Sequence, residues 1–313
     1  MPDPDSFPMN RRFQKVAVLM GGGSTEREIS LVSGKAVLGA LREAGYDAVP
    51  VVLDEENRFE LPAGAEAAFL ALHGAYGEDG GVQAALEARG LPYTGSGVES
   101  SRVSFDKTLS RAAFERTGVP VPPGYVIGPG VEEDAPRIAY PLVVKPPRQG
   151  SSVGVSIVRR ASEWAPALAL SRRYDPDVVV ERYIPGREWT VPIVGEGTAL
   201  PVVEIRPKVD WYDWRAKYSD DAGTDYVFPG DDPANAELAA RTQEIALRAY
   251  RAVGARGMGR IDLRIAPDGG IFALENNSIP GLTSHSLLPK AAAKAGIPFP
   301  ELCSRILEDA RCG

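Results

Sequence analysis

The chain has 313 residues, 44% of them hydrophobic and 25% charged, a composition that is typical of globular proteins and leaves room for two or three domains. The net charge of -7 provides no basic excess to neutralise a phosphate backbone, which excludes general affinity for nucleic acid. The two histidines and the two cysteines, Cys303 and Cys312, offer neither a histidine-rich metal site nor a disulfide framework.

Residues 1–14 lack an apolar run and are expected to form a disordered tail. No signal peptide or membrane-spanning stretch follows, so we expect a cytoplasmic protein without membrane attachment.

The first part of the chain alternates apolar runs with one periodic segment. The predicted elements are strand 16–20, a glycine turn at 21–23, helix 29–45, strand 49–53 and strand 67–72. This β-α-β order predicts a parallel sheet. A glycine turn before a helix is also typical of dinucleotide-binding domains, but Glu26 stands where that fingerprint needs its third glycine. Glu26 is better suited to an ammonium group, unless it only adds a favourable charge to the first helical turn.

The next segment places polar residues beside glycines. His73 lies where a strand opens into a glycine-rich loop, a position that suits either a ligand contact or a structural histidine. A helix from Gly80 to Gly90 and a boundary at 93–97 follow. Lys107 lies in the first turns of the next predicted helix and, taken alone, would be a solvated surface charge.

Residues 141–158 read as a strand ending at Lys145, a loop with Gly-Ser-Ser, and a second strand. Such a loop offers backbone N–H groups and hydroxyls to a phosphate, although it is not a Walker A loop. The elements expected after it are strands within 177–197, an irregular lid or surface loop at 206–231, helix 233–253, a hairpin at 260–277 and two closing helices.

The hairpin carries the most specific pattern. A two-residue loop at Asp268-Gly269 would place Asp262 opposite Glu275 and Arg260 opposite Asn277. These four residues would then share one face, while Ile261, Leu263, Ile265, Phe272 and Leu274 would share the other. Facing carboxylates with a carboxamide suit a hard divalent ion such as magnesium or manganese. The alternatives are a solvated outer face, or a three-residue loop that flips the register.

Taken in order, the segments KPPRQGSSVGV, VERYIPGREWT, RAKYSDD, GRIDLRI and LENNSIPGLTSHSLLP closely resemble the D-alanine:D-alanine ligase family of the ATP-grasp superfamily. The resemblance runs from Val16 to Leu307 and includes GGGSTEREIS and LHGAYGEDG. It implies an α/β fold with an N-terminal Rossmann-like parallel-sheet domain at 15–97 and two α+β subdomains that sandwich ATP. These would be a central subdomain at 98–183 and a C-terminal subdomain at 184–313, which carries the lid loop and the metal site.

The resemblance also implies roles for individual residues. ATP would be bound by Lys107, Lys145, Ser151, Ser152, Glu181, Ile184 and Glu188. Two Mg²⁺ or Mn²⁺ ions would be bound by Asp262, Glu275 and Asn277. The catalytic set would be Glu26, Ser151, Tyr218, Arg260 and Gly281, and the D-alanine substrates would meet Glu26, His73, Lys217, Ser286 and Leu287.

The implied reaction joins two D-alanines through an acyl phosphate, with ATP as the phosphate donor, for peptidoglycan precursor synthesis by a homodimer. The resemblance further implies that Tyr218 would favour D-alanine over D-lactate as the second substrate. Two segments depart from the commonest family pattern: Asn276 between Glu275 and Asn277, and Pro-Pro-Arg-Gln before Gly150. The alternatives are a related ligase that uses D-lactate, D-serine or another acceptor, a nucleotide-binding homologue without turnover, and a nicotinamide dehydrogenase.

Overall fold

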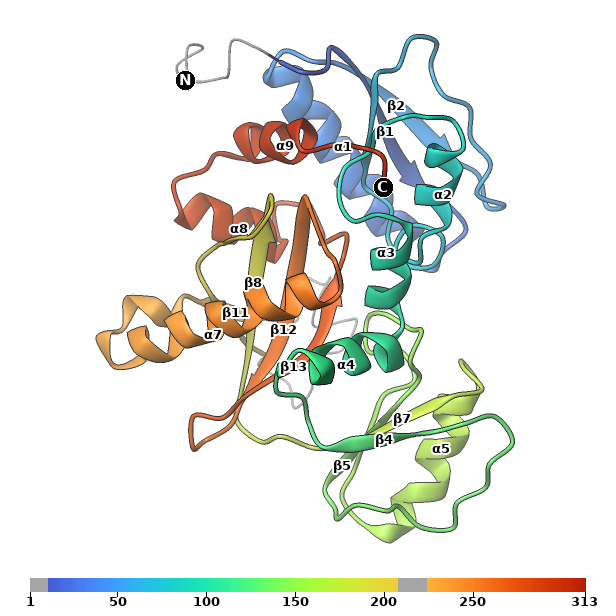
Figure 1. Cartoon of the computed structure of the whole chain (residues 1–313), viewed down its shortest axis with the longest axis vertical. Helices are drawn as coiled ribbons and strands as arrows, with labels where there is room; N and C mark the ends of the chain where they lie inside the picture. Colours follow the sequence, from blue (N-terminus) through green and yellow to red (C-terminus); the bar gives the residue numbers. More distant parts are fainter. Residues whose placement is uncertain (1–10, 208–223) are drawn as a thin grey trace.

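Three sheets follow one another along the computed structural model, which describes residues 11–207 and 224–313. Figure 1 shows the first sheet at one end of the molecule, the second at the opposite end, and the third between them. Of the expected tail, residues 1–10 lie outside the described residues, as do 208–223 of the expected lid. Within the described part, no helix is both long and apolar enough to cross a bilayer.

The first sheet is parallel, with strand order β2-β1-β3, which confirms the predicted β-α-β start. Its elements are β1 (Lys15–Gly21), α1 (Arg27–Glu43), β2 (Asp47–Leu53), β3 (Ala67–Leu70) and α2 (Gly81–Glu87). Strand β1 is central and its apolar run is buried on both faces, as expected for a parallel sheet.

The glycine turn after β1 packs against the turn after β2. Gly22 has a φ of +90°, and a Cβ on Gly23 would lie 2.1 Å from the Glu55 carbonyl oxygen. These glycines are therefore required for close backbone packing. That packing explains them without a dinucleotide.

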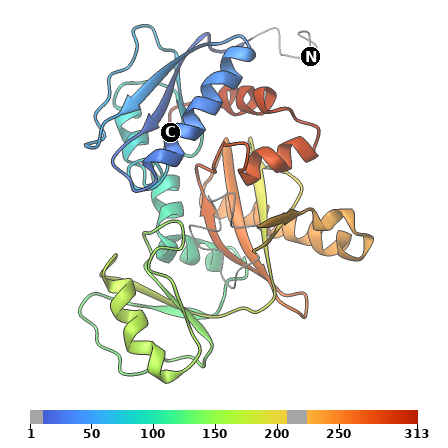
Figure 2. The ribbon, with the colours of Figure 1, turned by 180° about the vertical axis from the view of Figure 1, so that it is seen from behind.

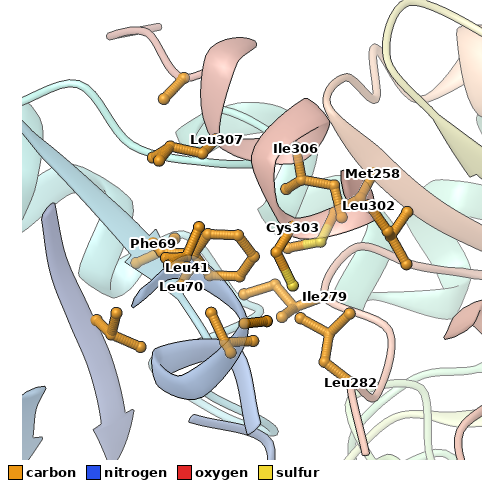
Figure 3. Packing of buried hydrophobic residues seen from close by; sticks show 14 of the residues in the cluster. Leu41, Phe69, Leu70, Met258, Ile279, Leu282, Leu302, Cys303, Ile306 and Leu307 are labelled. Atoms are coloured by element: carbon orange, nitrogen blue, oxygen red, sulfur yellow. The ribbon is translucent and has the colours of Figure 1, made fainter. Parts of the chain in front are cut away.

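Of the two C-terminal helices, α9 (Phe299–Glu308) packs against α1, and α8 (Leu287–Lys294) packs against α9. Figure 3 shows the shared core, in which residues of α1 and β3 meet residues from late in the chain. The labelled residues are Leu41, Phe69, Leu70, Met258, Ile279, Leu282, Leu302, Cys303, Ile306 and Leu307. This packing fixes the segment that follows the hairpin beside the first sheet.

The second sheet is antiparallel, with strand order β4-β7-β5-β6, and is covered by one helix. Its elements are β4 (Gly124–Ile127), β5 (Leu142–Lys145), β6 (Ser156–Val158), α5 (Trp164–Arg172) and β7 (Val178–Arg182), with a 3-10 helix at Ala161–Glu163. The predicted strand, loop and strand over 141–158 are confirmed as β5 and β6, which pair with each other.

The third sheet has six antiparallel strands in the order β11-β10-β8-β12-β13, with β9 also paired to β8. Its strands are β8 (Arg187–Val194), β9 (Thr198–Ala199), β10 (Val203–Arg206), β11 (Asp225–Val227), β12 (Met258–Ile265) and β13 (Ile271–Asn277). The helices that pack against it are α3 (Val98–Phe105), α4 (Lys107–Arg116), α7 (Pro233–Ala252) and the C-terminal α8, which contacts β8. A 3-10 helix spans Pro229–Asp231. Figure 2 shows α4 where the second and third sheets meet.

The hairpin of β12 and β13 has the predicted functional pairs but not the predicted loop. Asp262 pairs with Glu275 and Arg260 with Asn277, while beyond a register shift Leu263 pairs with Ala273. The shift leaves Leu274 as an extra residue, a β-bulge that offsets a three-residue loop closed between Ala266 and Gly270.

The predicted two-residue loop is therefore wrong, and so is the predicted choice of buried apolar residues near the turn. Ile271 and Ala273 are buried there in place of Phe272 and Leu274, which are only partly buried.

Candidate active site

One face of the hairpin gathers charged and polar groups around Asp262. Its Oδ1 accepts hydrogen bonds from Thr190 Oγ1 at 2.6 Å and Arg260 Nε at 2.8 Å. Its Oδ2 accepts from Arg260 Nη2 at 2.7 Å and Asn277 Nδ2 at 3.0 Å. Thr190 is fully buried on β8 and is the ladder partner of Asp262. The carboxylate is thus held from both neighbouring strands.

The facing carboxylate, Glu275, is paired with a lysine. Lys107 Nζ lies 2.9 Å from Glu275 Oε2, so each carboxylate of the pair is matched by one cation. Within 11–207 and 224–313, no group of three or more His, Cys, Asp or Glu is placed to hold a metal ion. The two carboxylates and the Asn277 amide nevertheless fit a hard divalent ion, because they supply oxygen donors and call for positive charge.

Lys107 is positioned by the start of α4. The N-cap residue Asp106 accepts from the Thr108 and Leu109 backbone N–H groups. Lys107 Nζ donates to the Gln149 carbonyl oxygen at 2.8 Å, and the Lys107 backbone N–H donates to that of Pro147 at 3.1 Å. The predicted phosphate loop therefore lies directly against this helix terminus.

A buried ion pair marks the second sheet. Lys145 Nζ, at the end of β5, donates to Glu181 Oε1 on β7 at 2.6 Å, and both side chains are less than a tenth exposed. They open onto a small cleft between the second and third sheets, lined by Lys107, Arg111, Val121, Pro122, Lys145, Val179, Glu181, Ala273 and Leu274. The bulge thus places Leu274 on an apolar wall of the cleft that Lys107 and Lys145 also line.

The connection from β7 to β8 is held by Arg264 on β12. This guanidinium donates to the carbonyl oxygens of Ile184 at 3.1 Å and Gly186 at 2.9 Å, and lies 3.4 Å from Glu188 Oε2. These bonds hold the backbone of the segment between β7 and β8 against β12. Three of the residues predicted for ATP, Glu181, Ile184 and Glu188, therefore lie within eight residues of one another along this stretch of chain.

Glu26 joins the first unit to the second sheet. It is the N-cap residue of α1, and its Oε1 accepts from Ser151 Oγ at 2.6 Å. Ser151 and Ser152 have φ values of 50° and 61°, the left-handed region that costs a non-glycine residue about 1–3 kcal/mol. Such strain persists only where the surroundings fix the backbone, as the bond to Glu26 does here.

His73 and Glu78, which belong to the loop after β3, lie close to Glu26. Burial lowers the pKa of His73, whose Nε2 is 3.0 Å from Ser33 Oγ. Burial and the charge of Glu26 raise the pKa of Glu78 to about 8, and Glu78 Oε2 accepts from the Gly74 N–H at 2.7 Å. At neutral pH this pocket therefore holds a neutral imidazole and a largely protonated acid beside the Glu26 carboxyl.

The segment after the hairpin completes the arrangement. Gly281 lies so close to Ser286 that an added Cβ would be 2.6 Å from Ser286 Oγ. That hydroxyl accepts from the Thr283 N–H at 3.0 Å and lies 2.9 Å from Thr283 Oγ1. Ser286 precedes α8, which begins at Leu287.

Many of the predicted residues thus contact one another: Glu26 with Ser151, Lys107 with Glu275, Asp262 with Arg260 and Asn277, Lys145 with Glu181, and Gly281 beside Ser286. Lys217 and Tyr218 lie outside the described residues.

Sequence reasoning missed three contributors: Glu78, Thr190 and Arg264. Only Glu78 had a local signal, because it stands five residues after His73 in the same glycine-rich loop.

Comparison with known proteins agrees with this geometry. Residues 15–66 match the family described as D-ala D-ala ligase N-terminus, and residues 128–308 match the one described as D-ala D-ala ligase C-terminus. The chain is 46% identical to a D-alanine-D-alanine ligase of Methylibium petroleiphilum, with 99% of this chain and 98% of the relative covered. A relative of the same name from Nitrosospira multiformis is also 46% identical, with 96% and 98% covered.

The fold is similar to that of a solved structure as well. The crystal structure of the D-alanine-D-alanine ligase from Bacillus anthracis superimposes with a TM-score of 0.82 at 36% identity, covering 95% of this chain and 97% of that one. With matches that span nearly the whole sequence, the chain belongs to the D-alanine-D-alanine ligase family and has the ATP-grasp fold.

Proposed function

We propose that the protein joins two D-alanines to D-alanyl-D-alanine, a peptidoglycan precursor, and converts ATP to ADP and phosphate. The carboxylate of the first D-alanine attacks the γ-phosphorus, forming an acyl phosphate and releasing ADP. The amine of the second D-alanine then attacks the acyl carbon and expels phosphate. Negative charge grows on the phosphoryl and tetrahedral oxygens in these steps, so fixed positive groups provide most of the stabilisation.

ATP occupies the cleft between the second and third sheets. Lys107 and Lys145 address its phosphates, and Ser151 and Ser152 close over them. The adenine edge meets Glu181 and the backbone N–H of Ile184, and Glu188 meets the ribose hydroxyls. This placement is supported by the cleft that both lysines and Glu181 line. The bond from Arg264 to the Ile184 carbonyl fixes the backbone that follows Glu181.

Asp262, Glu275 and Asn277 would hold two Mg²⁺ or Mn²⁺ ions when ATP is bound. Such ions supply charge neutralisation for the phosphate oxygens. In their absence, Lys107 and Arg260 neutralise the two carboxylates.

The amino-acid side is built around Glu26, which receives the ammonium of the first D-alanine. His73, neutral because burial lowers its pKa, lies beside this ammonium without repelling it. Arg260 and the Gly281 N–H stabilise the oxyanion, and Ser286, Leu287 and Lys217 meet the second substrate.

Tyr218 would complete the link between Ser151 and Glu26. We further propose that the protein works in the cytoplasm as a homodimer.

The observation that carries this proposal is the 2.6 Å bond from Ser151 Oγ to Glu26 Oε1. It joins the phosphate loop of the second sheet to the ammonium site of the first unit, 125 residues away in sequence. A nucleotide-binding protein without turnover would have no need to bring these two sites together.

The test is product analysis with ATP, Mg²⁺ and either D-alanine, D-serine or D-lactate as the acceptor. We expect D-alanyl-D-alanine and ADP in equal amounts from D-alanine, and loss of both in Glu275→Ala. A larger yield with D-lactate or D-serine would instead assign a related ligase. ATP binding without ADP formation from any acceptor would refute the ligase.

A further inference from the structure

One arginine in the phosphate loop joins three carboxylates from two other segments. Arg148 donates from Nε and Nη2 to the two carboxylate oxygens of Asp175 at 2.9 and 2.5 Å. It also donates from Nη2 to Asp177 Oδ2 at 2.9 Å and from Nη1 to Asp106 Oδ2 at 3.2 Å. These acids raise the pKa of Arg148 further. We call these four residues the Arg148 clamp.

The clamp reaches the ATP-phosphate lysine through α4. Asp106 Oδ1 accepts from the Thr108 N–H at 2.8 Å and so caps the helix that begins with Lys107, while Oδ2 accepts from Arg148. The loop residues on either side of Arg148 bind Lys107 directly through their carbonyl oxygens. Movement of Arg148 would therefore move the loop and Lys107 together.

The other end of the loop carries the strained serines. Ser151 and Ser152 keep positive φ values while Ser151 bonds to Glu26 across the site. A strained conformation persists only where its surroundings fix it. The clamp fixes the base of the loop two residues before Gly150, and the bond to Glu26 fixes its tip.

Direct phosphate binding by Arg148 is the competing role. Asp175 is 4% exposed, and turning the guanidinium toward a phosphate would leave that buried carboxylate without this partner. An uncompensated buried charge is strongly unfavourable. The geometry therefore favours a structural attachment over a phosphate contact.

We propose that Arg148 is a positioning residue, which locks the phosphate loop to α4 and to Asp175 and Asp177 so that Lys107 and Ser151 are held in their reactive places. This inference rests on the proposed ligase function.

The test compares Arg148→Lys and Asp177→Asn with a control, Arg160→Lys, which alters an arginine that is 76% exposed and paired with Glu163. The readouts are KM for ATP, kcat, phosphate released per dipeptide, and amide hydrogen exchange over residues 148–153 and 108–109. We expect Arg148→Lys to raise KM for ATP about tenfold, equivalent to about 1.4 kcal/mol, and to release more than one phosphate per dipeptide as the loop opens to water.

Asp177→Asn separates the two roles, because it leaves the charge of Arg148 and its bond to Asp175 intact. A positioning role predicts faster exchange in the loop and a higher KM for ATP in this variant. An unchanged or lower KM with unchanged exchange would overturn the proposal and favour direct phosphate binding. If Arg148→Lys does not fold, Asp177→Asn decides alone.

Hydrogen exchange also separates this inference from the proposed function. Faster loop exchange in the variants, with no dipeptide from the wild type, would refute the ligase and support the clamp. Dipeptide formation by the wild type, with unaltered hydrogen exchange in both variants, would support the ligase and refute the clamp.

Discussion

The hydroxyl of Thr190 provides a sharp test of the metal site, because Thr190→Val removes it without changing the shape of the side chain. Its 2.6 Å hydrogen bond reaches a carboxylate that is 7% exposed, and hydrogen bonds to charged groups contribute about 1.5–3 kcal/mol. Arg260 and Asn277 still donate three bonds to Asp262 in the variant. We therefore expect the low end of that range, a loss of about 1.5 kcal/mol in the free energy of unfolding.

The same change should weaken metal binding about tenfold, since loss of a partner that orients a ligand typically costs 10–100-fold in affinity. The assays are urea unfolding and titration of Mn²⁺ by electron paramagnetic resonance with ADP present. Thr190→Ser keeps the hydroxyl and should stay within about twofold of the wild type. Thr242→Val, which removes a buried hydroxyl bonded to the Leu238 carbonyl of α7, should leave Mn²⁺ affinity unchanged. Wild-type affinity in Thr190→Val would refute the assignment of Asp262 as an oriented ligand.

Two further predictions concern the amino-acid side of the site. Because burial raises the pKa of Glu78 from 4.5 to about 8, the stability that it contributes is full below pH 4.5 and is lost as pH rises through 8. Glu78→Gln mimics the protonated acid, so the wild-type Tm should fall relative to this variant between about pH 4.5 and 8. A wild-type Tm that runs parallel to that of Glu78→Gln over this range would contradict the assignment, whereas the exposed control Glu43→Gln should run parallel to the wild type. Gly281→Ala should displace Ser286, because the new Cβ would lie 2.6 Å from its Oγ. Overpacking of this kind costs ~1–3 kcal/mol, so we expect KM for the second D-alanine to rise roughly tenfold. Gly39→Ala, which meets no atom within 4 Å, is its control, and equal KM values would argue against a role for Ser286 in substrate binding.

The parallel start of the fold could be predicted because its signals are local. The run Val16 to Met20 is apolar at every position, as a strand buried on both faces requires, and the segment that follows has helical periodicity. Short strands such as β4 and β11 could not be predicted in the same way. They are strands because neighbouring strands pair with them, and the sequence alone does not contain that information.

The hairpin shows both the strength and the limit of pattern reasoning. The pairing of Asp262 with Glu275 was predicted correctly from the turn. The loop, however, has three residues, and such a loop alone would have shifted the register and separated the polar residues. The bulge at Leu274 corrects the register, and a bulge is stabilised by tertiary contacts that local spacing does not reveal. Here the extra residue also lines the cleft.

The role of Asn276 could be decided only from the structure. Its position between Glu275 and Asn277 raised doubt about the metal site, but strand alternation points it to the other face. Its Nδ2 donates to Ser104 Oγ on α3 at 2.8 Å, away from the carboxylates. The departure therefore concerns how β13 packs on α3 and leaves the oxygen donors in place.

Residues that act through others were the hardest to find. Thr190 meets Asp262 from a strand 72 residues away, and Arg148 meets Asp175 across 27 residues. A threonine in a strand and an arginine in a loop are each common and carry no signal alone. Their significance arises only when the sheets bring them to a charged partner.

The most direct test of the central claim follows an oxygen atom. D-alanine labelled with ¹⁸O in its carboxyl group is incubated with ATP, Mg²⁺ and the protein, and the released phosphate is analysed by mass spectrometry. An acyl phosphate transfers one carboxyl oxygen to each phosphate that the second amine expels, so we predict one ¹⁸O per phosphate and one phosphate per dipeptide. Unlabelled phosphate released alongside ADP would mean that water, and not a D-alanine carboxylate, attacks ATP, and would contradict the account.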